Sequence, residues 1–469
     1  MKVHLVAICG TGMGSLAGLL KEAGHEVSGS DRTFYPPMSE RLQAWGIPTR
    51  QGFDPAHIDL DTDLVIVGNV CRRDNPEAQA ALQRGMKVMS FPQALSEFFI
   101  AGKSSVVVAG THGKTTTAAL LSYVLVEAGL DPSFLIGGIP QNFGKSFHLG
   151  QGQVFVVEGD EYDAAFFDKR PKFVHYRPQI VILTAVEFDH ADIYPDMEAY
   201  RAAFTTLVSL LPADGLLVAC ADDPEVNALA KSAPCRVVSY GLDPDATWSA
   251  AEIQPGEEAT RFSLIHQRSY VTSVVLPLAG RHNVANTLGV LATAEALAVG
   301  AKKAAGYLAD FSGVARRMQV RGVVDGVMVI DDFAHHPTKV RETVQAVRAR
   351  YPRSRLVAVF EPRTNTSRRK IFQETYLASF AGADEVIVVP PYDADKIPEA
   401  DRFDAAALVA ALQKNGQQAA RYPTADEVVS ALSGRLGKDT VVLIMSNGAF
   451  DNIHEKLLLA LHARHEEKG

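Results

Sequence analysis

Short apolar runs alternate with amphipathic stretches in the first hundred residues of the chain. The runs predict strands at residues 3–8, 25–30, 64–67 and 87–90, and the stretches between them predict helices at residues 15–23 and 75–84. Strands that alternate with helices are typical of a parallel sheet covered by helices on both faces. We therefore expect an α/β fold in this part of the chain.

The same alternation continues to the end of the chain. A second group of strands is expected at residues 105–109, 154–157, 180–183 and 216–220, with helices at 115–128, 197–211 and 283–298 and a hairpin at 262–266 and 270–277. A third group has strands at 328–330, 356–360, 385–389 and 441–445 and helices at 338–351 and 369–380. Residues 310–317, rich in glycine and charge, indicate a linker. We predict three domains, residues 1–102, 103–314 and 315–469, of which the first and third are Rossmann-like.

Composition narrows the class of protein. The chain has 469 residues, a net charge of -8 and 47% hydrophobic residues, which excludes extended disorder and disfavours a nonspecific nucleic-acid binder. No apolar run approaches the roughly 20 residues that span a bilayer, so we expect no membrane contact. The four cysteines lie far apart at positions 9, 71, 220 and 235, which argues against a zinc knuckle or a disulfide framework. Because the N-terminus also lacks a cationic leader, we expect a cytoplasmic protein.

The strongest local signal is a glycine loop between the apolar run 105–109 and the following helix. Its residues are Gly110, Thr111, His112, Gly113, Lys114, Thr115 and Thr116. Backbone N–H groups at a helix N-terminus bind phosphate, while Lys114 would neutralise the β- and γ-phosphates of a nucleotide and Thr115 would ligate Mg²⁺. The usual pattern has a glycine where this chain has Val108, and the alternative is a plain turn with an exposed lysine. We predict ATP binding and a mostly parallel central sheet of the P-loop ATPase type.

Acidic residues follow two other predicted strands of the central domain. Residues 158–163 read EGDEYD and residues 187–190 read EFDH. Ligands of an open parallel sheet bind outside the carboxyl ends of its strands, and magnesium at phosphoryl-transfer sites takes one or two carboxylates. The spacing does not decide which of Glu158, Asp160, Glu161 and Asp163 ligates a metal ion.

A second glycine loop lies at the N-terminus and comprises Gly10, Thr11, Gly12, Met13 and Gly14. Asp31 follows Gly10 by 21 residues, close to the ribose-binding position of a dinucleotide fingerprint. Ser15 stands where the third glycine of that fingerprint is expected, so the loop indicates only a pyrophosphate-bearing ligand. The alternative is a tight turn with close helix packing.

Two neighbouring histidines, His335 and His336, could be metal ligands. Adjacent side chains point in different directions on an extended chain, and no third ligand is nearby in sequence. We therefore expect no metal site formed by both histidines.

Together these motifs resemble the Mur ligase family, the ATP-dependent ligases that build the peptide stem of peptidoglycan. The resemblance rests on GTHGKTT, EGDEYD, EFDHAD, GRHNVAN, ARRMQ and DDFAHHP in this order and covers nearly the whole chain. Three segments, KFVHYRP, FEPRTNT and MSNGAFDNIHEKLL, resemble the branch of the family that joins UDP-N-acetylmuramate to the recycled murein tripeptide L-alanyl-γ-D-glutamyl-meso-diaminopimelate. We name it the tripeptide branch; the alternative is the L-alanine branch, which usually has an EADESD-like motif in place of EGDEYD.

The resemblance implies a role for each matching residue. Lys114, Glu158 and His190 would be catalytic; Thr115, Glu158 and His190 would hold Mg²⁺; Asn283, Asn286, Arg317 and Asp332 would contact ATP, together with the glycine loop; and Gly10 to Gly14 with Asp31 would bind UDP-sugar. Because Arg317 and Asp332 lie in or beyond the linker, we expect them to complete the ATP site only after domain closure. A monomer or weak oligomer is expected.

The acceptor is expected to bind where predicted strands of the third domain end. Arg363 and Asn365 follow the run 356–360, and Ser446 and Asn447 follow the run 441–445. A guanidinium binds a carboxylate through two parallel bonds, and the tripeptide carries several carboxylates. The alternative is that Arg363 makes an ordinary surface or interdomain ion pair.

The sequence alone also leaves three other functions possible. An ATP-binding regulatory module without ligase activity would not need the full set of Lys114, Glu158 and His190. A nicotinamide-dependent dehydrogenase rests on the N-terminal glycines alone. A folate-glutamate ligase would not need the first hundred residues.

Overall fold

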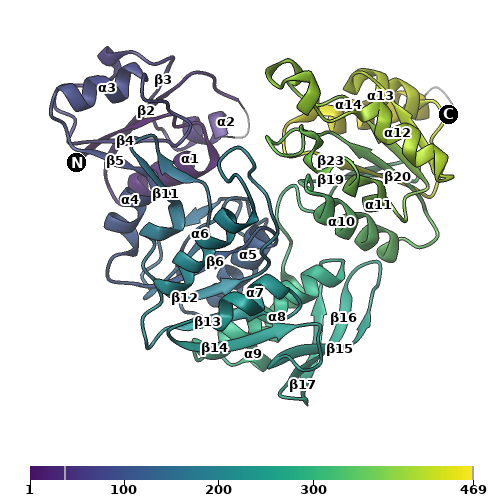
Figure 1. Cartoon of the computed structure of the whole chain (residues 1–469), viewed down its shortest axis with the longest axis horizontal. Coiled ribbons are helices and arrows are strands. Elements are labelled where there is room, and N and C mark those ends of the chain that lie inside the picture. The colour runs from purple at the N-terminus through teal and green to yellow at the C-terminus, as the bar shows by residue number, and fades with distance from the viewer. Residues whose placement is uncertain (36–37, 467–469) are drawn as a thin grey trace.

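The computed structural model describes residues 1–35 and 38–466, which form three α/β domains arranged around a central sheet (Figure 1). The predicted α/β class is confirmed. The predicted domain boundaries fall between the sheets and stay a prediction. Among the described residues, no helix combines the length and the apolar composition needed to cross a membrane.

The N-terminal sheet is fully parallel, with strand order β3-β2-β1-β4-β5. Its strands are β1 (Lys2–Val6), β2 (Glu26–Asp31), β3 (Thr49–Gln51), β4 (Leu64–Val67) and β5 (Val88–Ser90), and its helices are α1 (Thr11–Glu22), α2 (Met38–Ala44), α3 (Pro76–Gln83) and α4 (Phe91–Leu95). Helix α1 begins at Thr11, so the expectation of a helix that begins at residue 15 is wrong. The glycines at 12 and 14 belong to its first turn because Gly14 N–H already donates to Gly10 O at 2.8 Å.

The central sheet has ten strands in the order β17-β16-β15-β14-β13-β12-β6-β9-β7-β8. Its strands are β6 (Ser104–Ala109), β7 (Ser133–Leu135), β8 (Phe147–His148), β9 (Val154–Gly159), β12 (Pro178–Leu183), β13 (Leu216–Cys220), β14 (Arg236–Gly241), β15 (Trp248–Gln254), β16 (Thr260–His266) and β17 (Ser269–Leu276). The helices are α5 (Lys114–Glu127), α6 (Met197–Ser209), α7 (Pro224–Ala230), α8 (Arg281–Ala296) and α9 (Ala301–Tyr307). The predicted hairpin is confirmed as β16 and β17, which pair antiparallel. A separate two-stranded hairpin, β10 (Asp163–Ala165) and β11 (Asp168–Pro171), follows β9.

The C-terminal sheet has the order β18-β19-β23-β20-β21-β22, in which β18 alone runs antiparallel to its neighbour. Its strands are β18 (Gln319–Val324), β19 (Val327–Asp332), β20 (Arg355–Phe360), β21 (Glu385–Val388), β22 (Gln418–Arg421) and β23 (Thr440–Met445), with helices α10 (Pro337–Arg350), α11 (Thr375–Ser379), α12 (Ala405–Lys414), α13 (Ala425–Ser433) and α14 (Ile453–Glu466). The helix expected over residues 369–380 is wrong. Within this range only α11 is an α-helix, because a 3-10 turn at Lys370–Phe372 precedes it. The side-chain amide of Gln373 also donates to the Asp404 carbonyl and accepts the Asp404 N–H.

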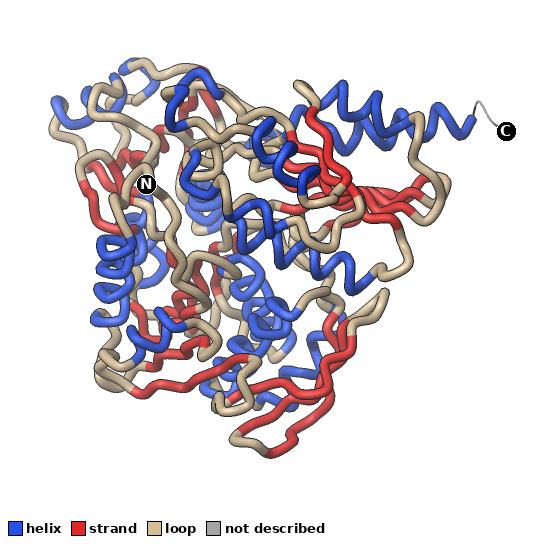
Figure 2. The backbone as a smooth tube through the Cα atoms, turned by 45° about the vertical axis from the view of Figure 1, so that its right-hand side comes forward, coloured by secondary structure: helices blue, strands red, loops and turns tan. Residues whose placement is uncertain are grey.

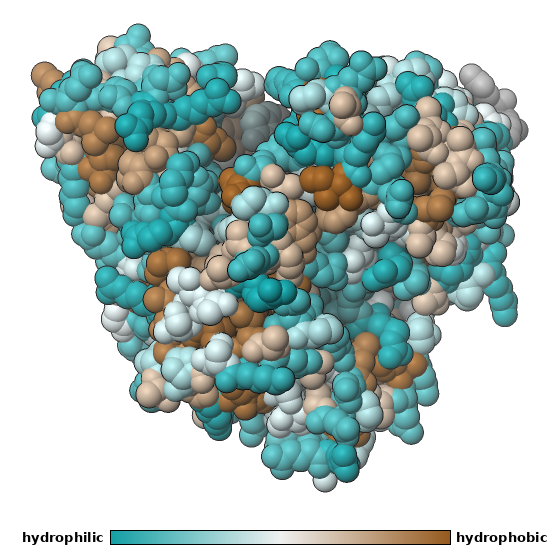
Figure 3. Space-filling view, viewed as in Figure 1, coloured by the Kyte–Doolittle hydropathy of each residue, from teal (hydrophilic) through white to brown (hydrophobic). Residues whose placement is uncertain are grey.

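The N-terminal and central domains share a hydrophobic core, whereas the C-terminal domain has separate cores. One continuous core joins the N-terminal and central domains, and at their contact Phe147 packs against α1 and Trp45. The C-terminal sheet instead has its own core on each face. In the tube view this domain lies beside the other two (Figure 2), and the surface is hollowed between it and the N-terminal domain (Figure 3). Several of the residues predicted to bind ATP lie where the central and C-terminal domains meet.

Candidate active site

The glycine loop between β6 and α5 is hydrogen-bonded to the two residues that directly follow β12, Thr184 and Ala185. Thr111 N–H donates to Ala185 O at 2.7 Å, and the Thr184 hydroxyl donates to His112 O. Gly113 caps α5 in the left-handed region (φ 81°), and a Cβ there would lie 2.5 Å from Asn286 Oδ1. This position therefore requires glycine for its backbone and for its close approach to α8.

Lys114 enters a buried charged cluster at the carboxyl ends of β6, β9 and β12. Its ammonium donates to both carboxylate oxygens of Glu161 at 2.9 and 3.0 Å, and His190 Nε2 lies 3.0 Å from the same carboxylate. Burial opposes a charge on Lys114, yet Glu161 and Asp160 raise its pKa above the ordinary value. Burial likewise opposes a charge on His190, but Glu161 raises its pKa. The cluster thus holds the Glu161 carboxylate between the Lys114 ammonium and the His190 imidazole.

Thr115 and Glu158 form a second, adjoining pair. The Thr115 hydroxyl donates to Glu158 Oε2 at 3.1 Å, and Gly137 N–H donates to the other carboxylate oxygen at 2.5 Å. Burial raises the pKa of Glu158 above its ordinary value, although Gly137 N–H and Lys114 act in the opposite direction. A hydroxyl and a carboxylate oxygen side by side are donors that Mg²⁺ prefers. Two of the three predicted metal ligands therefore meet here, whereas His190 contacts Glu161 instead of Glu158.

One pocket brings together most of the residues predicted to bind ATP. Its lining comprises Gly113, Thr115, Thr116, Leu278, His282, Asn283, Asn286, Val314, Arg317, Met318, Asp332, Lys339 and Thr343. The central domain contributes the start of α5 and of α8, and the C-terminal domain contributes the end of β19 and α10. These elements converge from positions more than two hundred residues apart in the chain.

Arg317 and Asp332 already belong to this pocket. Arg317 Nη2 donates to Thr115 Oγ1 at 3.3 Å, and its guanidinium lies 4.7 Å from the ring centre of Phe333. Asp332 accepts from the Met318 and Ala334 N–H groups, both at 2.8 Å. This arrangement of the domains already has both side chains in the site, and the expected closure that would bring them there stays a prediction.

Two of the four residues predicted to bind the acceptor contact Glu361, which directly follows β20. Arg363 lies 3.4 Å from the Glu361 carboxylate, and the Ser446 hydroxyl donates to the same group. The Arg363 guanidinium also stacks 3.7 Å above the ring centre of Tyr392. Burial raises the pKa of Glu361, against Ser446 and Arg363. The predicted Arg363 and Ser446 thus share one wall of the C-terminal domain.

The other two predicted acceptor residues lie differently. Asn365 donates its amide to Asp192 at 2.8 Å, a bond between the C-terminal and central domains. Asn447 Oδ1 is buried and has no hydrogen-bond partner among the described residues. An unpaired buried oxygen is a free acceptor for a ligand donor.

The N-terminal glycine loop is a compact turn closed by Asp31. Asp31 accepts the Cys9 N–H at 2.8 Å and its own neighbour Arg32 N–H at 2.7 Å. Gly14 packs where a Cβ would run into Met38, whereas a Cβ at Gly10 would meet no atom within 4 Å. The backbone around Gly10 is therefore open, while Asp31 shapes the loop in addition to any role with a ligand.

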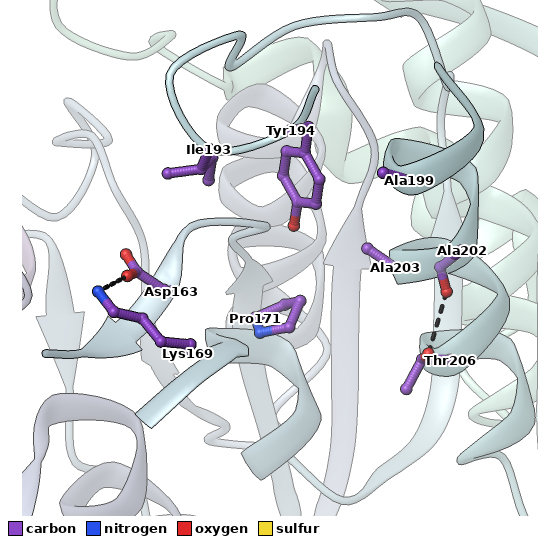
Figure 4. A pocket seen from close by; sticks show the side chains of 9 residues that line it. All are labelled: Asp163, Lys169, Pro171, Ile193, Tyr194, Ala199, Ala202, Ala203 and Thr206. Carbon is purple, nitrogen blue, oxygen red and sulfur yellow. Dashed lines mark hydrogen bonds and ion pairs between the residues drawn. The ribbon is translucent and has the colours of Figure 1, made fainter. Parts of the chain in front are cut away.

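A separate hollow opens beside the charged cluster (Figure 4). It is lined by Asp163, Lys169, Pro171, Ile193, Tyr194, Ala199, Ala202, Ala203 and Thr206. Tyr194 connects it to the cluster, since its hydroxyl donates to the Glu161 backbone carbonyl at 2.6 Å. Among the residues that the sequence singled out, Asp163 lines this hollow, whereas most of those predicted to bind ATP line the pocket between the domains.

Comparison with known sequences matches all three domains. The Mur ligase family catalytic domain matches residues 2–102, the Mur ligase middle domain matches 108–294, and the Mur ligase glutamate ligase domain matches 316–448. The chain belongs to the Mur ligase family. The family assignment agrees with the three α/β domains and with the glycine loop between β6 and α5 in the middle domain.

Individual relatives of this Mur ligase cover almost its whole length. The UDP-N-acetylmuramate–L-alanyl-γ-D-glutamyl-meso-2,6-diaminoheptandioate ligase of Escherichia coli (strain K12) is 39% identical over 99% of each chain. The UDP-N-acetylmuramate–L-alanine ligase of Salinibacter ruber is 33% identical over 95% of this chain and 92% of its own. The crystal structure of a murein peptide ligase from Psychrobacter arcticus has a TM-score of 0.73 and 34% identity, and covers 98% of each chain.

The sequence did not predict two features of this Mur ligase site. Glu161 was left among four acidic candidates, yet it is the residue that joins Lys114 to His190. His282 and Lys339 line the pocket between the domains, and the sequence predicted no role for either. The position of Glu161 close to the end of the buried strand β9 was a signal, but three other carboxylates, Glu158, Asp160 and Asp163, shared it.

Proposed function

We propose that this Mur ligase joins the lactyl carboxylate of UDP-N-acetylmuramate to the amine of L-alanyl-γ-D-glutamyl-meso-diaminopimelate, with hydrolysis of ATP. The observation that carries the proposal is the pocket between the domains, where a phosphate loop, Arg317 and Asp332 meet. The relatives of both the tripeptide and the L-alanine branch support the sugar-nucleotide substrate, and the relative from Escherichia coli supports the tripeptide.

ATP would bind with its phosphates on the loop that precedes α5. The N–H groups at this helix N-terminus and the Lys114 ammonium attract phosphate oxygens. Asn283 and Asn286, in the first two turns of α8, would face the adenine side, and Asp332 would face the ribose. When bound, Mg²⁺ would be held by Thr115 and Glu158 and would offset the charge of the transferring phosphoryl group.

The reaction needs activation because a carboxylate is a poor electrophile. A carboxylate oxygen of the substrate attacks the γ-phosphorus of ATP, and the bond between this phosphorus and the β-phosphate oxygen breaks. ADP departs, and the product of this step is an acyl phosphate. The amine then attacks the acyl carbon, the bond to the phosphate oxygen breaks, and inorganic phosphate departs as the amine loses a proton. Lys114 stabilises the charge that develops during the first step.

Glu161 would position the two cations of the cluster. It is fully buried and contacts both Lys114 and His190, so it fixes where their positive charges lie. A preorganised charge costs little reorganisation when the reaction occurs. The C-terminal domain would also shield the acyl phosphate from water, because it covers the pocket from the side of α10.

The acceptor tripeptide would lie against the wall formed by Arg363 and Ser446. Stacking on Tyr392 holds the guanidinium flat, which suits the two parallel bonds that a carboxylate accepts. The unpaired Asn447 Oδ1 offers an acceptor on the same wall. Free L-alanine has a single carboxylate and a methyl group and would fill little of this surface.

Acceptor choice is tested by phosphate release from ATP with UDP-N-acetylmuramate and either the tripeptide or L-alanine. We expect turnover with the tripeptide, and faster release with L-alanine would move the protein to the L-alanine branch. Arg363→Ala should raise the KM for the tripeptide by roughly 10- to 100-fold, from a charge-assisted bond of about 1.5–3 kcal/mol, and leave the KM for UDP-N-acetylmuramate unchanged. The matched control is Arg353→Ala, an exposed arginine before the same strand β20.

A further inference from the structure

Two histidines and a glutamate from three distant segments meet at the edge of the phosphate loop. One ligand atom from each of His112, Glu187 and His336 lies within 4.8 Å of the other two. His112 Nε2 is 3.5 Å from Glu187 Oε2, and His336 Nδ1 is 3.7 Å from the same oxygen. His112 and Glu187 belong to the central domain, and His336 directly precedes α10 of the C-terminal domain.

The two separations that end on Glu187 Oε2 fit a tetrahedral metal ion, and the third ligand pair lies within 4.8 Å. Bonds of about 2.0–2.1 Å from zinc to nitrogen and oxygen place tetrahedral ligand atoms about 3.4 Å apart. The observed 3.5 and 3.7 Å are close to that separation. Two imidazoles and one carboxylate are a ligand set of catalytic zinc sites, which keep a fourth position for water. Glu187 is partly exposed, so the fourth position can reach solvent.

A second observation is that the Nε2 nitrogen of His112 is unpaired. Its side chain is 8% exposed, and Nε2 is buried without a hydrogen-bond partner among the described residues. A buried imidazole nitrogen that lacks a partner is unfavourable unless something binds it. Burial, and next the charge of His336, hold the pKa of His112 well below its ordinary value. The neutral ring has a lone pair available for a metal ion.

Outer contacts orient the other two ligands. The Thr338 hydroxyl donates to Glu187 Oε2 at 2.6 Å. His336 Nε2 lies 3.3 Å from the Phe188 carbonyl, which leaves Nδ1 toward Glu187. Nδ1 also accepts the Thr338 N–H at 3.3 Å as the cap of α10, so a bound metal ion would take the place of this long hydrogen bond. Metal-bound histidines ordinarily donate their second nitrogen to such a carbonyl.

We propose that His112, Glu187 and His336 form a site for a divalent transition metal ion of the zinc type, separate from the magnesium pair of Thr115 and Glu158. Nitrogen donors favour zinc over magnesium, which prefers oxygen. Because one ligand comes from the start of α10 and another from the phosphate loop, a bound ion ties the C-terminal domain to that loop. The concentration of available metal ions would therefore affect how freely the C-terminal domain moves relative to the central domain.

The neighbouring histidine provides the matched control. His335 faces the other way: its Nδ1 lies 3.0 Å from the Phe333 carbonyl and its Nε2 lies 3.9 Å from Asp189. His335 and His336 thus contact different partners. Folding brings Glu187 and His112 to His336 from elsewhere in the chain, which the spacing of the two histidines did not indicate.

The experiment is a titration of the untagged full-length protein with Co²⁺, read by visible absorption, followed by displacement with Zn²⁺. We expect one tetrahedral cobalt complex for each chain, removed by zinc. His336→Ala should weaken binding by at least about 100-fold, because loss of an outer partner alone costs about 10- to 100-fold. Thr338→Val should weaken it about 10-fold, and His335→Ala should bind like the wild type.

The proposal is overturned if the wild type gives only the weak spectrum of octahedral cobalt or no binding. It is equally overturned if His336→Ala retains the tetrahedral spectrum. Circular dichroism checks that each variant is folded. Should His336→Ala fail to fold, Glu187→Gln is measured in its place, and retention of the tetrahedral complex in that variant overturns the site.

Discussion

The chain contains two glycine loops between a strand and a helix, and they are built differently. In the central loop, Gly113 is left-handed and a lysine follows it into a buried cluster of charges. In the N-terminal loop, Gly10 has an ordinary φ of -68°, and the first turn of α1 contains no acidic side chain. Asp31 closes this loop by accepting the Cys9 N–H.

The difference shows how one local motif serves two tasks. The central loop places a fixed cation beside carboxylates, which is what transfer of a phosphoryl group demands. The N-terminal loop offers backbone N–H groups and open space around Gly10, which suffices to bind a ligand that does not react there. The two loops contain similar numbers of glycines, so under the proposed function their charged neighbours distinguish the loop that would perform chemistry from the loop that would only bind.

The largest expected effect comes from Lys114→Ala. Removal of a preorganised charge at the transferring phosphoryl group should lower kcat by roughly 100- to 1,000-fold, as measured by phosphate release. Circular dichroism should be unchanged. The control Lys169→Ala removes a largely exposed lysine that pairs with Asp163 at the rim of the separate hollow. Turnover of Lys114→Ala close to that of the control would contradict the distinction between the loops.

Alanine in each loop tests the backbone directly. Gly113→Ala forces a left-handed alanine against Asn286 and should lower the free energy of unfolding by about 1–3 kcal/mol. Gly10→Ala occupies open space at an ordinary φ and should change it by no more than about 1 kcal/mol in either direction. Urea unfolding of both variants gives the comparison, and equal losses would show that the loops have the same backbone demands.

Asp31→Asn tests the binding task of the N-terminal loop. The amide oxygen can still accept the Cys9 N–H, but the negative charge is lost. Calorimetry should show UDP-N-acetylmuramate binding weakened by about 10-fold, from loss of a charged hydrogen bond, with kcat at saturation unchanged. Wild type should bind no NADH at comparable concentration. Tight NADH binding would instead favour a nicotinamide site.

The smallest expected effect is the pH dependence of the charged cluster. His190 is left-handed (φ 54°), a conformation that asparagine tolerates, so His190→Asn is the suitable variant. Glu161 raises the pKa of His190 in the folded state against the effect of burial. The stability from this charge is therefore fully present below a pH of about 6.5 and lost as pH rises through the folded pKa. Urea unfolding of wild type and variant should differ more at low pH; a constant difference would contradict the ion pair.

The sequence predicted the buried strands well but missed exposed elements. Strands such as residues 64–67 and 216–220 are continuous apolar runs, and the structure has them at the same residues. Strand β15 was missed because its second half is largely exposed and polar, and β18 because it is an exposed edge strand. Periodicity cannot identify a strand that does not face a core.

The site was predictable where a motif stands at a strand end. Thr115, Glu158, Arg317 and Asp332 were each identified from the sequence, and the structure brings them to one place. The link through Glu161 was not, because spacing along the chain does not state which carboxylate a lysine reaches. The triad of His112, Glu187 and His336 depends on the packing of two domains, which a single sequence does not reveal.

The central claim is that the lactyl carboxylate of UDP-N-acetylmuramate is phosphorylated at the central loop. It is tested most directly by supplying UDP-N-acetylmuramate with both lactyl carboxylate oxygens labelled with ¹⁸O, together with ATP and the tripeptide. An acyl phosphate intermediate predicts that each released phosphate carries one labelled oxygen for every amide formed. Unlabelled phosphate, released while the amide forms, would contradict the account.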